Sequence, residues 1–281
     1  MHLLLLGPIP TQCEPYLRDY LTTPWSIVGV RDVTDRAAVR GALRDADALI
    51  SVSFEPDMTD AAGKLRLLAV PGAGVDAVQR SALPARCAVT NVFEHETPSA
   101  EYVMLNVLLH ATEQNRYART MRQGRWDGSG RHFGAFHDEV LGKTIGLVGY
   151  GRIGRAVATR ARAFGMRTCA VRQAPAPDEA LDWCGGIDQL DRLLAEADYL
   201  VLACPLTDQT RGLLGEAQLR RMKPTAMLIN PARGHIVDEQ ALYRALKERW
   251  IAGAALAAWY EDAADLDTVM HGSSLPSHEP G

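Results

Sequence analysis

Three glycines at positions 149, 151 and 154, spaced as Gly-x-Gly-x-x-Gly, follow a short apolar run at residues 144–148. This spacing is typical of a strand, a tight turn and a helix that together bind a dinucleotide pyrophosphate. Gly149 permits the turn, Gly151 lets the backbone approach the phosphates, and Gly154 lets the helix pack closely. The phosphate charge is expected at the helix N-terminus, where free N–H groups and the helix dipole favour an anion.

An arginine follows a second apolar run. Arg233 lies just beyond residues 226–229 and precedes Gly234, which gives the backbone freedom to turn. A guanidinium at the carboxyl end of a strand can bind a planar carboxylate through two parallel hydrogen bonds and polarise a neighbouring carbonyl. The position of Arg233 therefore indicates a binding role for an acidic substrate.

A third strand end turns through small residues. The apolar run at residues 67–70 stops at Pro71 and continues as Gly72, Ala73 and Gly74. Consecutive backbone N–H groups in such a turn can form a nest that holds an anion. A tight turn without a ligand is an equally good interpretation, because glycine turns after strands are common.

Arg172 stands at the end of the run 167–171, about 20 residues past the glycines. At that position an Asp or Glu accepts a hydrogen bond from the ribose 2′-OH of NAD, whereas an Arg pairs with the 2′-phosphate of NADP. Arg172 therefore favours NADP, although a solvated arginine or one stacked on the adenine would fit the sequence too.

The elements that must position these residues alternate between strands and helices. Strands are expected at residues 2–6, 26–30, 48–53, 65–70, 88–92, 144–148, 167–171, 199–203, 226–229 and 251–256. Helices are expected at residues 34–44, 97–122, 155–164, 187–197, 213–222 and 238–250. This alternation predicts an α/β protein with parallel sheets.

The helix at 97–122 is expected to link two domains. Pro98 suits its first turn, and Tyr102, Leu105, Leu108 and Leu109 are spaced for a buried face. Just before it, His95 is a candidate for substrate contact, although a loop histidine is more often solvated.

Composition excludes several classes of function. The chain has 281 residues, 47% hydrophobic and 23% charged, with a formal net charge of −4. A chain of this length is expected to form two domains, and its charge gives no general attraction to nucleic acid or anionic membranes. The five cysteines lack metal-binding or disulfide spacing, so small-molecule partners, no metal and a cytoplasmic location are expected.

Several motifs together resemble the D-isomer-specific 2-hydroxyacid dehydrogenases. They are Gly149-Tyr-Gly-Arg-Ile-Gly154, Cys-Pro-Leu-Thr207, Ile-Asn-Pro-Ala-Arg-Gly234 with Val-Asp238, and Gly-Ala-Ala-Leu256. The resemblance implies two doubly wound parallel-sheet domains, a flavodoxin-like substrate domain followed by a Rossmann dinucleotide-binding domain. It places the substrate domain at residues 1–96 and the NAD(P)-binding domain at 97–262. Residues 263–281 are expected to form a poorly ordered tail, because they are rich in Asp, Ser, Pro and Gly.

The resemblance also implies the site residues. Substrate is expected to contact Gly72, Ala73, Gly74 and the catalytic Arg233. Cofactor is expected to contact Gly149, Tyr150, Gly151, Arg152, Ile153, Gly154, Arg172, Cys204, Pro205, Thr210, Pro231, Ala232, Arg233 and Ala257. The acid is a histidine whose pKa is raised by a paired carboxylate, and His278 and Asp262 are the residues that can be placed in those roles.

The chain departs from the family pattern at three points. Ala257 stands where the family has an aspartate that contacts the nicotinamide amide, and Asp262 stands where it has a glutamate. The Pro-His segment and the helix after it are not recognisable, since the sequence ends Leu-Pro-Ser-His-Glu-Pro-Gly281. Two interpretations remain: an NAD(P)-dependent oxidoreductase acting on a small 2-oxo or 2-hydroxy acid, or a truncated or degenerate relative that binds dinucleotide with impaired catalysis. The resemblance also suggests a homodimer built around the 98–122 helix.

Overall fold

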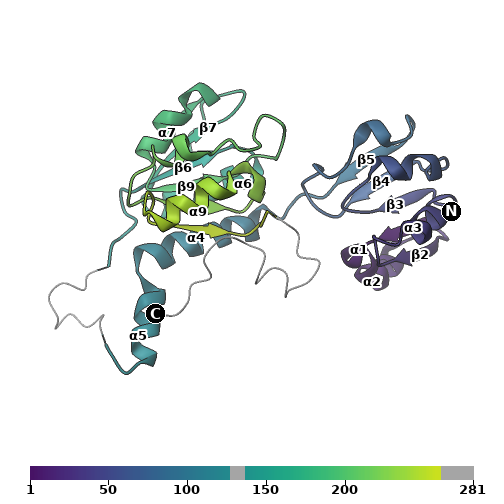
Figure 1. Ribbon diagram of the computed structural model, residues 1–281, viewed down its shortest axis with the longest axis horizontal. Helices are drawn as coiled ribbons and strands as arrows, with labels where there is room; N and C mark the ends of the chain where they lie inside the picture. Colours follow the sequence, from purple (N-terminus) through teal and green to yellow (C-terminus); the bar gives the residue numbers. More distant parts are fainter. Residues whose placement is uncertain (127–136, 261–281) are drawn as a thin grey trace. The chain divides into compact units, whose positions relative to one another are not determined.

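The computed structural model describes residues 1–126 and 137–260 (Figure 1). The chain divides into two compact units, the first Met1–Glu94 and the second beginning at His95. Each unit contains one sheet in which all strand pairs are parallel. No helix in these described ranges is both long and apolar enough to cross a membrane.

The first unit is a five-stranded sheet in the order β2-β1-β3-β4-β5. Its strands are β1 (His2–Leu6), β2 (Ser26–Val30), β3 (Ala48–Ile50), β4 (Leu67–Val70) and β5 (Ala88–Asn91). This order is the one found in flavodoxin-like folds. The predicted flavodoxin-like sheet is therefore confirmed.

Both faces of that sheet are covered. Leu4 and Leu6 pack into one core cluster, whereas Leu3 and Leu5 pack into a second one. The covering elements are α1 (Pro8–Gln12), α2 (Glu14–Tyr20), α3 (Arg36–Leu43) and the 3-10 helices η1 (Pro56–Ala61) and η2 (Arg80–Ala82). A strand buried on both faces must be apolar throughout, which explains the unbroken Leu3–Leu6 run.

The second unit is a six-stranded sheet in the order β11-β10-β9-β6-β7-β8. Its strands are β6 (Thr144–Val148), β7 (Arg167–Val171), β8 (Trp183–Gly185), β9 (Tyr199–Leu202), β10 (Met227–Asn230) and β11 (Gly253–Leu256). Numbered within the unit, the order is 3-2-1-4-5-6, which defines the Rossmann fold. Its switch point lies between β6 and β9, so ligands are expected beyond the carboxyl ends of these strands.

Helices cover both faces of this second sheet. The covering helices are α4 (Glu96–Ala111), α6 (Arg152–Ala163), α7 (Leu190–Glu196), α8 (Glu216–Leu219) and α9 (Glu239–Lys247), with 3-10 helices η3 (Ile187–Gln189) and η4 (Gly234–Ile236). α5 (Gln114–Arg122) follows α4 and contributes no residue to the core clusters of this sheet. Residues of α4 and α6 share one core cluster with the sheet, and residues of α7, α8 and α9 share the other.

The predicted single helix at 97–122 is wrong. α4 ends at Ala111, Glu113 takes a left-handed conformation with φ 48°, and the chain changes direction before α5 (Figure 1). The Ala111 carbonyl accepts a hydrogen bond from the Asp138 N–H instead of continuing the helix. The break therefore depends on a contact distant in the sequence.

The predicted buried face of this helix is correct in part, because Tyr102 and Leu108 pack against the core cluster but Leu105 does not. Leu105 is 54% exposed, whereas α4 buries Ala100, Val103, Met104 and Val107 against α6 and the sheet. The buried set follows helical spacing on another side of α4.

Other boundaries differ by a few residues. α6 begins at Arg152, three residues before the expected start, because Gly151 is its N-cap. Leu213 and Leu214 precede α8 rather than forming part of it, and Leu214 makes an isolated parallel bridge with Val237. Strand β8 was not expected, since its three residues carry no apolar run.

Candidate functional site

The glycine turn between β6 and α6 has three distinct environments. Gly149 has φ 97°, and a Cβ built on it would lie 2.6 Å from the Ala203 carbonyl oxygen. A Cβ at Gly154 would lie 2.7 Å from the Gly149 oxygen, whereas a Cβ at Gly151 would meet nothing within 4 Å. Two glycines therefore permit close backbone packing, and Gly151 borders open space that suits a bound phosphate.

The backbone of this turn is better placed for binding than its side chains. The first hydrogen bond of α6 joins the Arg155 N–H to the Gly151 carbonyl, so the preceding amides are those that helix geometry leaves for an anion. The Tyr150 side chain is only 3% exposed and Ile153 packs against the core. Arg152 is the first residue of α6, and its Nη1 lies 3.8 Å from a carboxylate oxygen of Glu96, the first residue of α4.

Arg172 lies directly after β7 and is half-buried. Its N–H donates to the Gly185 carbonyl at 3.0 Å, which anchors the backbone at this point to β8. The guanidinium is thus carried at the carboxyl edge of the sheet, beside the strand that delivers the glycine turn.

The loop after β9 is held by its own hydroxyl groups. The Thr210 hydroxyl donates to the Pro205 carbonyl at 2.7 Å and accepts from the Thr207 N–H at 2.8 Å. Burial raises the pKa of the Cys204 thiol to about 11, so this thiol is neutral at physiological pH. These residues shape the loop beside the glycine turn. The side chains of Cys204, Pro205, Thr207 and Thr210 are all uncharged.

Arg233 lies in the loop that follows β10. Its backbone is extended, its guanidinium is half-buried, and Nη1 donates to the Ala232 carbonyl at 3.0 Å. Asn230, fully buried, accepts from the Ala232 N–H at 3.0 Å and donates to the Arg233 carbonyl at 2.8 Å. The Asn230 amide therefore fixes the turn Asn230-Pro231-Ala232 that presents Arg233.

Asn230 is a positioning residue that the sequence reasoning missed. A signal was available, since an amide at the end of a buried strand must find hydrogen-bond partners there. The Asn230 carbonyl also accepts from the Ala257 N–H at 3.0 Å, so it joins the ends of β10 and β11. Ala257 is exposed at this edge.

The structure thus brings the predicted residues of the second unit that lie within 137–260 to one edge of one sheet. The turns after β6, β7, β9, β10 and β11 all lie at the carboxyl ends of parallel strands. An edge of this kind is where open α/β sheets bind ligands.

The Gly72–Gly74 loop belongs to the first unit. The Gly72 carbonyl accepts from the Val92 N–H at 3.1 Å, and the Ala73 carbonyl accepts from the Asn91 side chain at 2.8 Å. An alternating nest needs a left-handed residue, and residues 71–76, all of them described, contain none. The alternating form of the expected nest is therefore not present, and the carbonyl groups of Gly72 and Ala73 hold the loop to the end of β5.

The candidate acid residues have different outcomes. Asp262 and His278 lie outside the described residues. His95 is the N-cap of α4, where its carbonyl accepts from the Ser99 hydroxyl at 3.0 Å. His235 is exposed after Arg233, with its ring 5.8 Å from that of Tyr260. Within residues 1–126 and 137–260, no group of three or more His, Cys, Asp or Glu side chains could hold a metal ion.

Comparison with known proteins identifies the family. A family model described as the NAD binding domain of D-isomer specific 2-hydroxyacid dehydrogenases matches residues 102–275. A glyoxylate reductase of Korarchaeum cryptofilum is 38% identical over 236 residues, which cover 81% of this chain and 70% of that protein. A glyoxylate reductase of Thermococcus kodakarensis is 39% identical over 230 residues, which cover 78% and 68%.

Solved structures agree with this assignment. The crystal structure of a glyoxylate reductase from Paecilomyes thermophila is 26% identical and superposes with a TM-score of 0.77, covering 93% of this chain and 82% of that one. The family model supplies an NAD-binding function for the domain that contains the glycine turn. The chain belongs to the D-isomer specific 2-hydroxyacid dehydrogenase family.

Proposed function

We propose that this protein is an NAD(P)-dependent oxidoreductase that interconverts a small 2-oxo acid and the corresponding D-2-hydroxy acid. The observation that carries the proposal is the placement of Arg233 and the glycine turn at the same carboxyl edge of one sheet. Relatives named glyoxylate reductase, 38% and 39% identical, support glyoxylate as the first substrate to test.

The residues of the second unit fit a dinucleotide. Gly151 borders open space at the N-terminus of α6, so the amides there are assigned to the pyrophosphate. Arg172 is assigned to the 2′-phosphate, which favours NADPH over NADH. The bound coenzyme supplies the hydride in reduction. The uncharged side chains of the loop after β9, from Cys204 to Thr210, are assigned to exclude water from that edge.

Arg233 is assigned to the substrate. Its guanidinium pairs with the carboxylate of the 2-oxo acid and polarises the adjacent carbonyl, which orients the carbon that accepts hydride. The Gly72–Gly74 loop of the first unit stays a proposed substrate-binding segment. His278, assisted by Asp262, is assigned to protonation of the carbonyl oxygen, and both residues lie outside the described residues.

The experiment measures loss of nicotinamide absorbance with NADPH or NADH and glyoxylate, hydroxypyruvate, pyruvate or longer homologues. Arg233→Ala is expected to abolish turnover while coenzyme still binds. Arg221→Ala is the matched control, because Arg221 is an exposed arginine of the same unit whose Nε lies 3.2 Å from Asp191. Turnover that survives in Arg233→Ala would contradict the proposal.

A second candidate is a relative that binds dinucleotide with impaired catalysis. Ala257 favours it, because a methyl group stands at the end of β11 where the family carries a carboxylate. Nucleotide binding by the wild-type protein, measured by fluorescence, without turnover on any 2-oxo acid would support this candidate over the first.

A further inference from the structure

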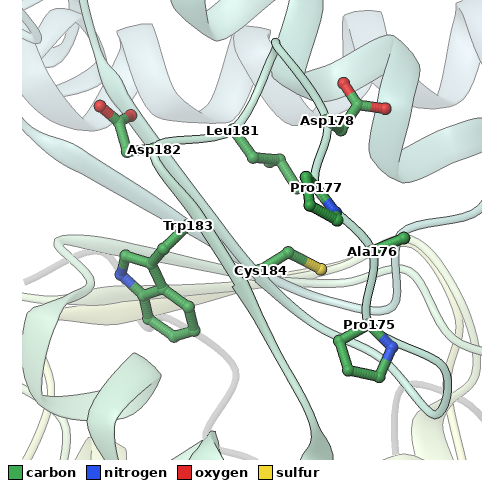
Figure 2. Close-up of a pocket in the computed structure, with 8 residues that line it drawn as sticks. All are labelled: Pro175, Ala176, Pro177, Asp178, Leu181, Asp182, Trp183 and Cys184. Atoms are coloured by element: carbon green, nitrogen blue, oxygen red, sulfur yellow. The ribbon is translucent and has the colours of Figure 1, made fainter.

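The connection between β7 and β8 crosses the sheet without a helix. Residues 172–182 join these parallel strands through a chain that contains Pro175 and Pro177. Figure 2 shows both prolines, Leu181 and Cys184 around a hollow beside this crossover. The hollow has a volume of about 300 Å³. Because packed side chains do not fill this space, the position of the crossover depends on a few specific attachments.

Asp178 supplies the main attachment. Its carboxylate forms an ion pair with Arg155 of α6, accepts a hydrogen bond from the Tyr150 hydroxyl, and accepts another from the Ala180 N–H at 3.0 Å. Hydrogen bonding, chiefly from the Ala180 amide, holds the pKa of Asp178 below its usual value, so the carboxylate stays charged.

The partners of Asp178 belong to the glycine turn and the helix it begins. Tyr150 lies between Gly149 and Gly151, and the Arg155 guanidinium carbon lies 4.7 Å from the centre of the Tyr150 ring. Tyr150 is almost fully buried, so this ring is a fixed support. Asp178 therefore connects the crossover directly to the turn that is assigned to the pyrophosphate.

The start of the same crossover bears Arg172. Its backbone N–H is fixed on Gly185, and the neighbouring Gln173 side chain donates to the Gln209 side chain at 2.8 Å. Gln209 belongs to the loop after β9, on the other side of β6 in the sheet order. Arg172 is thus held between the β8 strand, the β9 loop and the attachment at Asp178.

We propose that Asp178 is a positioning residue for coenzyme selection, which holds the crossover on the glycine turn and so fixes Arg172 opposite the adenosine ribose. The inference rests on the proposed dinucleotide binding. Asp178 touches no reacting atom. Its ion pair also holds the Arg155 guanidinium on the crossover, and Arg172 is the residue whose position is assigned to discrimination between a 2′-phosphate and a 2′-hydroxyl.

The test compares Asp178→Ala and Arg155→Met with Glu179→Ala. Glu179 is exposed, adjacent in the crossover, and makes no hydrogen bond or ion pair with the described residues, so its variant removes the same charge without removing an attachment. Dissociation constants for NADPH and NADH are measured by nicotinamide fluorescence. The ratio of the two constants is expected to move toward one by about tenfold in Asp178→Ala, since one charged hydrogen bond is at stake.

The variants also test whether one attachment is responsible. Arg155→Met is expected to shift the ratio in the same direction by a smaller factor, because the Tyr150 hydroxyl and the Ala180 N–H still donate to Asp178. The double variant is expected to match Asp178→Ala, since the ion pair is already lost when Asp178 is absent. Glu179→Ala is expected to keep the wild-type ratio. In the unliganded protein, amide hydrogen exchange in residues 172–182 is expected to be faster in Asp178→Ala and unchanged in Glu179→Ala.

The failures are distinguishable. A wild-type ratio in Asp178→Ala, or an equal shift in Glu179→Ala, would overturn this inference and leave the proposed function intact. Absence of nucleotide binding by the wild-type protein would overturn both. If Asp178→Ala does not fold by circular dichroism, Tyr150→Phe removes one donor to Asp178 and keeps the ring; unchanged exchange in 172–182 would then count against the inference.

Discussion

Gly234 lies so close to Trp259 that a Cβ atom at position 234 would be 2.6 Å from the Trp259 carbonyl oxygen. The residue after Arg233 thus supports the chain that leaves β11. Gly234→Ala is expected to push this segment away, with a loss of about 1–3 kcal/mol in the free energy of unfolding and a higher KM for the 2-oxo acid. Chemical denaturation and steady-state kinetics measure the two effects.

Gly253→Ala is the control for that substitution. A Cβ at Gly253 would meet nothing within 4 Å, so this variant should resemble the wild type. Equal stability of Gly234→Ala and Gly253→Ala would show that the Trp259 segment moves aside at no cost.

Substitutions of Gly151 and Gly154 should have different effects, with Gly151→Ala acting mainly on coenzyme binding and Gly154→Ala mainly on stability. Gly154→Ala is expected to lower the free energy of unfolding by about 1–3 kcal/mol, because the methyl group meets the Gly149 oxygen. Gly151→Ala should lower the free energy of unfolding by a smaller amount, about 0.5–1 kcal/mol, because Ala is a poorer N-cap than Gly. It should weaken NAD(P)H binding about tenfold by entering the space assigned to phosphate. Thermal unfolding and fluorescence titration of the two variants provide the measurement, and unaltered binding in Gly151→Ala would argue against that assignment.

His110 should make stability depend on pH. Burial lowers its pKa, although the charges of Glu113 and Asp138 oppose the shift, and its ring contacts that of Tyr199 edge-on. The unfolded chain therefore binds the proton more tightly than the folded protein does. The contribution of His110 is fully present above the unfolded pKa of about 6.5 and is lost as pH falls toward the lowered folded pKa.

The His110→Phe variant keeps an aromatic ring against Tyr199 and removes this titration. Its free energy of unfolding, measured by denaturant titration between about pH 7 and pH 5, should fall less steeply than that of the wild type. Identical slopes would exclude His110 as the titrating group.

Leu105 provides a test of the homodimer that we propose around α4. Its side chain is 54% exposed on this helix. Leu105→Arg is expected to weaken self-association at least about tenfold, as charge at the centre of an interface does, while Ile187→Arg, 50% exposed in η3, should not. Light scattering after gel filtration gives the masses, and a monomeric wild type would refute the dimer.

Ala257 allows the two functional candidates to be compared. Ala257→Asp places a carboxylate at the exposed end of β11, and one added hydrogen bond to the nicotinamide amide should raise kcat/KM about tenfold. Ala252→Asp adds the same charge at the opposite end of this strand. Equal kinetics in both variants and the wild type would show that Ala257 does not limit the reaction.

Much of the fold is predictable from the sequence, because buried strands appear in it as short apolar runs. β1, β6 and β7 have the bounds expected from their apolar runs, since parallel strands covered on both faces must be hydrophobic. Asp238 caps α9 as expected, accepting from the Ala241 N–H at 2.7 Å. Local chemistry was sufficient in each of these cases.

Other features depend on contacts between distant segments. The sequence near Thr112 and Glu113 contains no glycine or proline that would predict the end of α4. In the structure, the Ala111 carbonyl at this end accepts a hydrogen bond from the Asp138 N–H. In the candidate site, Arg233 was identified from its strand, whereas the role of Asp178 depends on Arg155 and Tyr150, which only the folded sheet brings to it. Contacts between residues that are distant in the sequence cannot be predicted from residue spacing alone.

In the helix-free crossover, residues proposed to influence coenzyme selection are separate from residues that pack the core. A change within a strand or helix disturbs packed side chains on a face of the sheet, but residues 173–177 are all exposed beside the hollow. Substitutions or short insertions in such a segment leave the core untouched. We therefore expect that residues 173–177 can be altered, and the proposed coenzyme preference with them, without loss of the packed core.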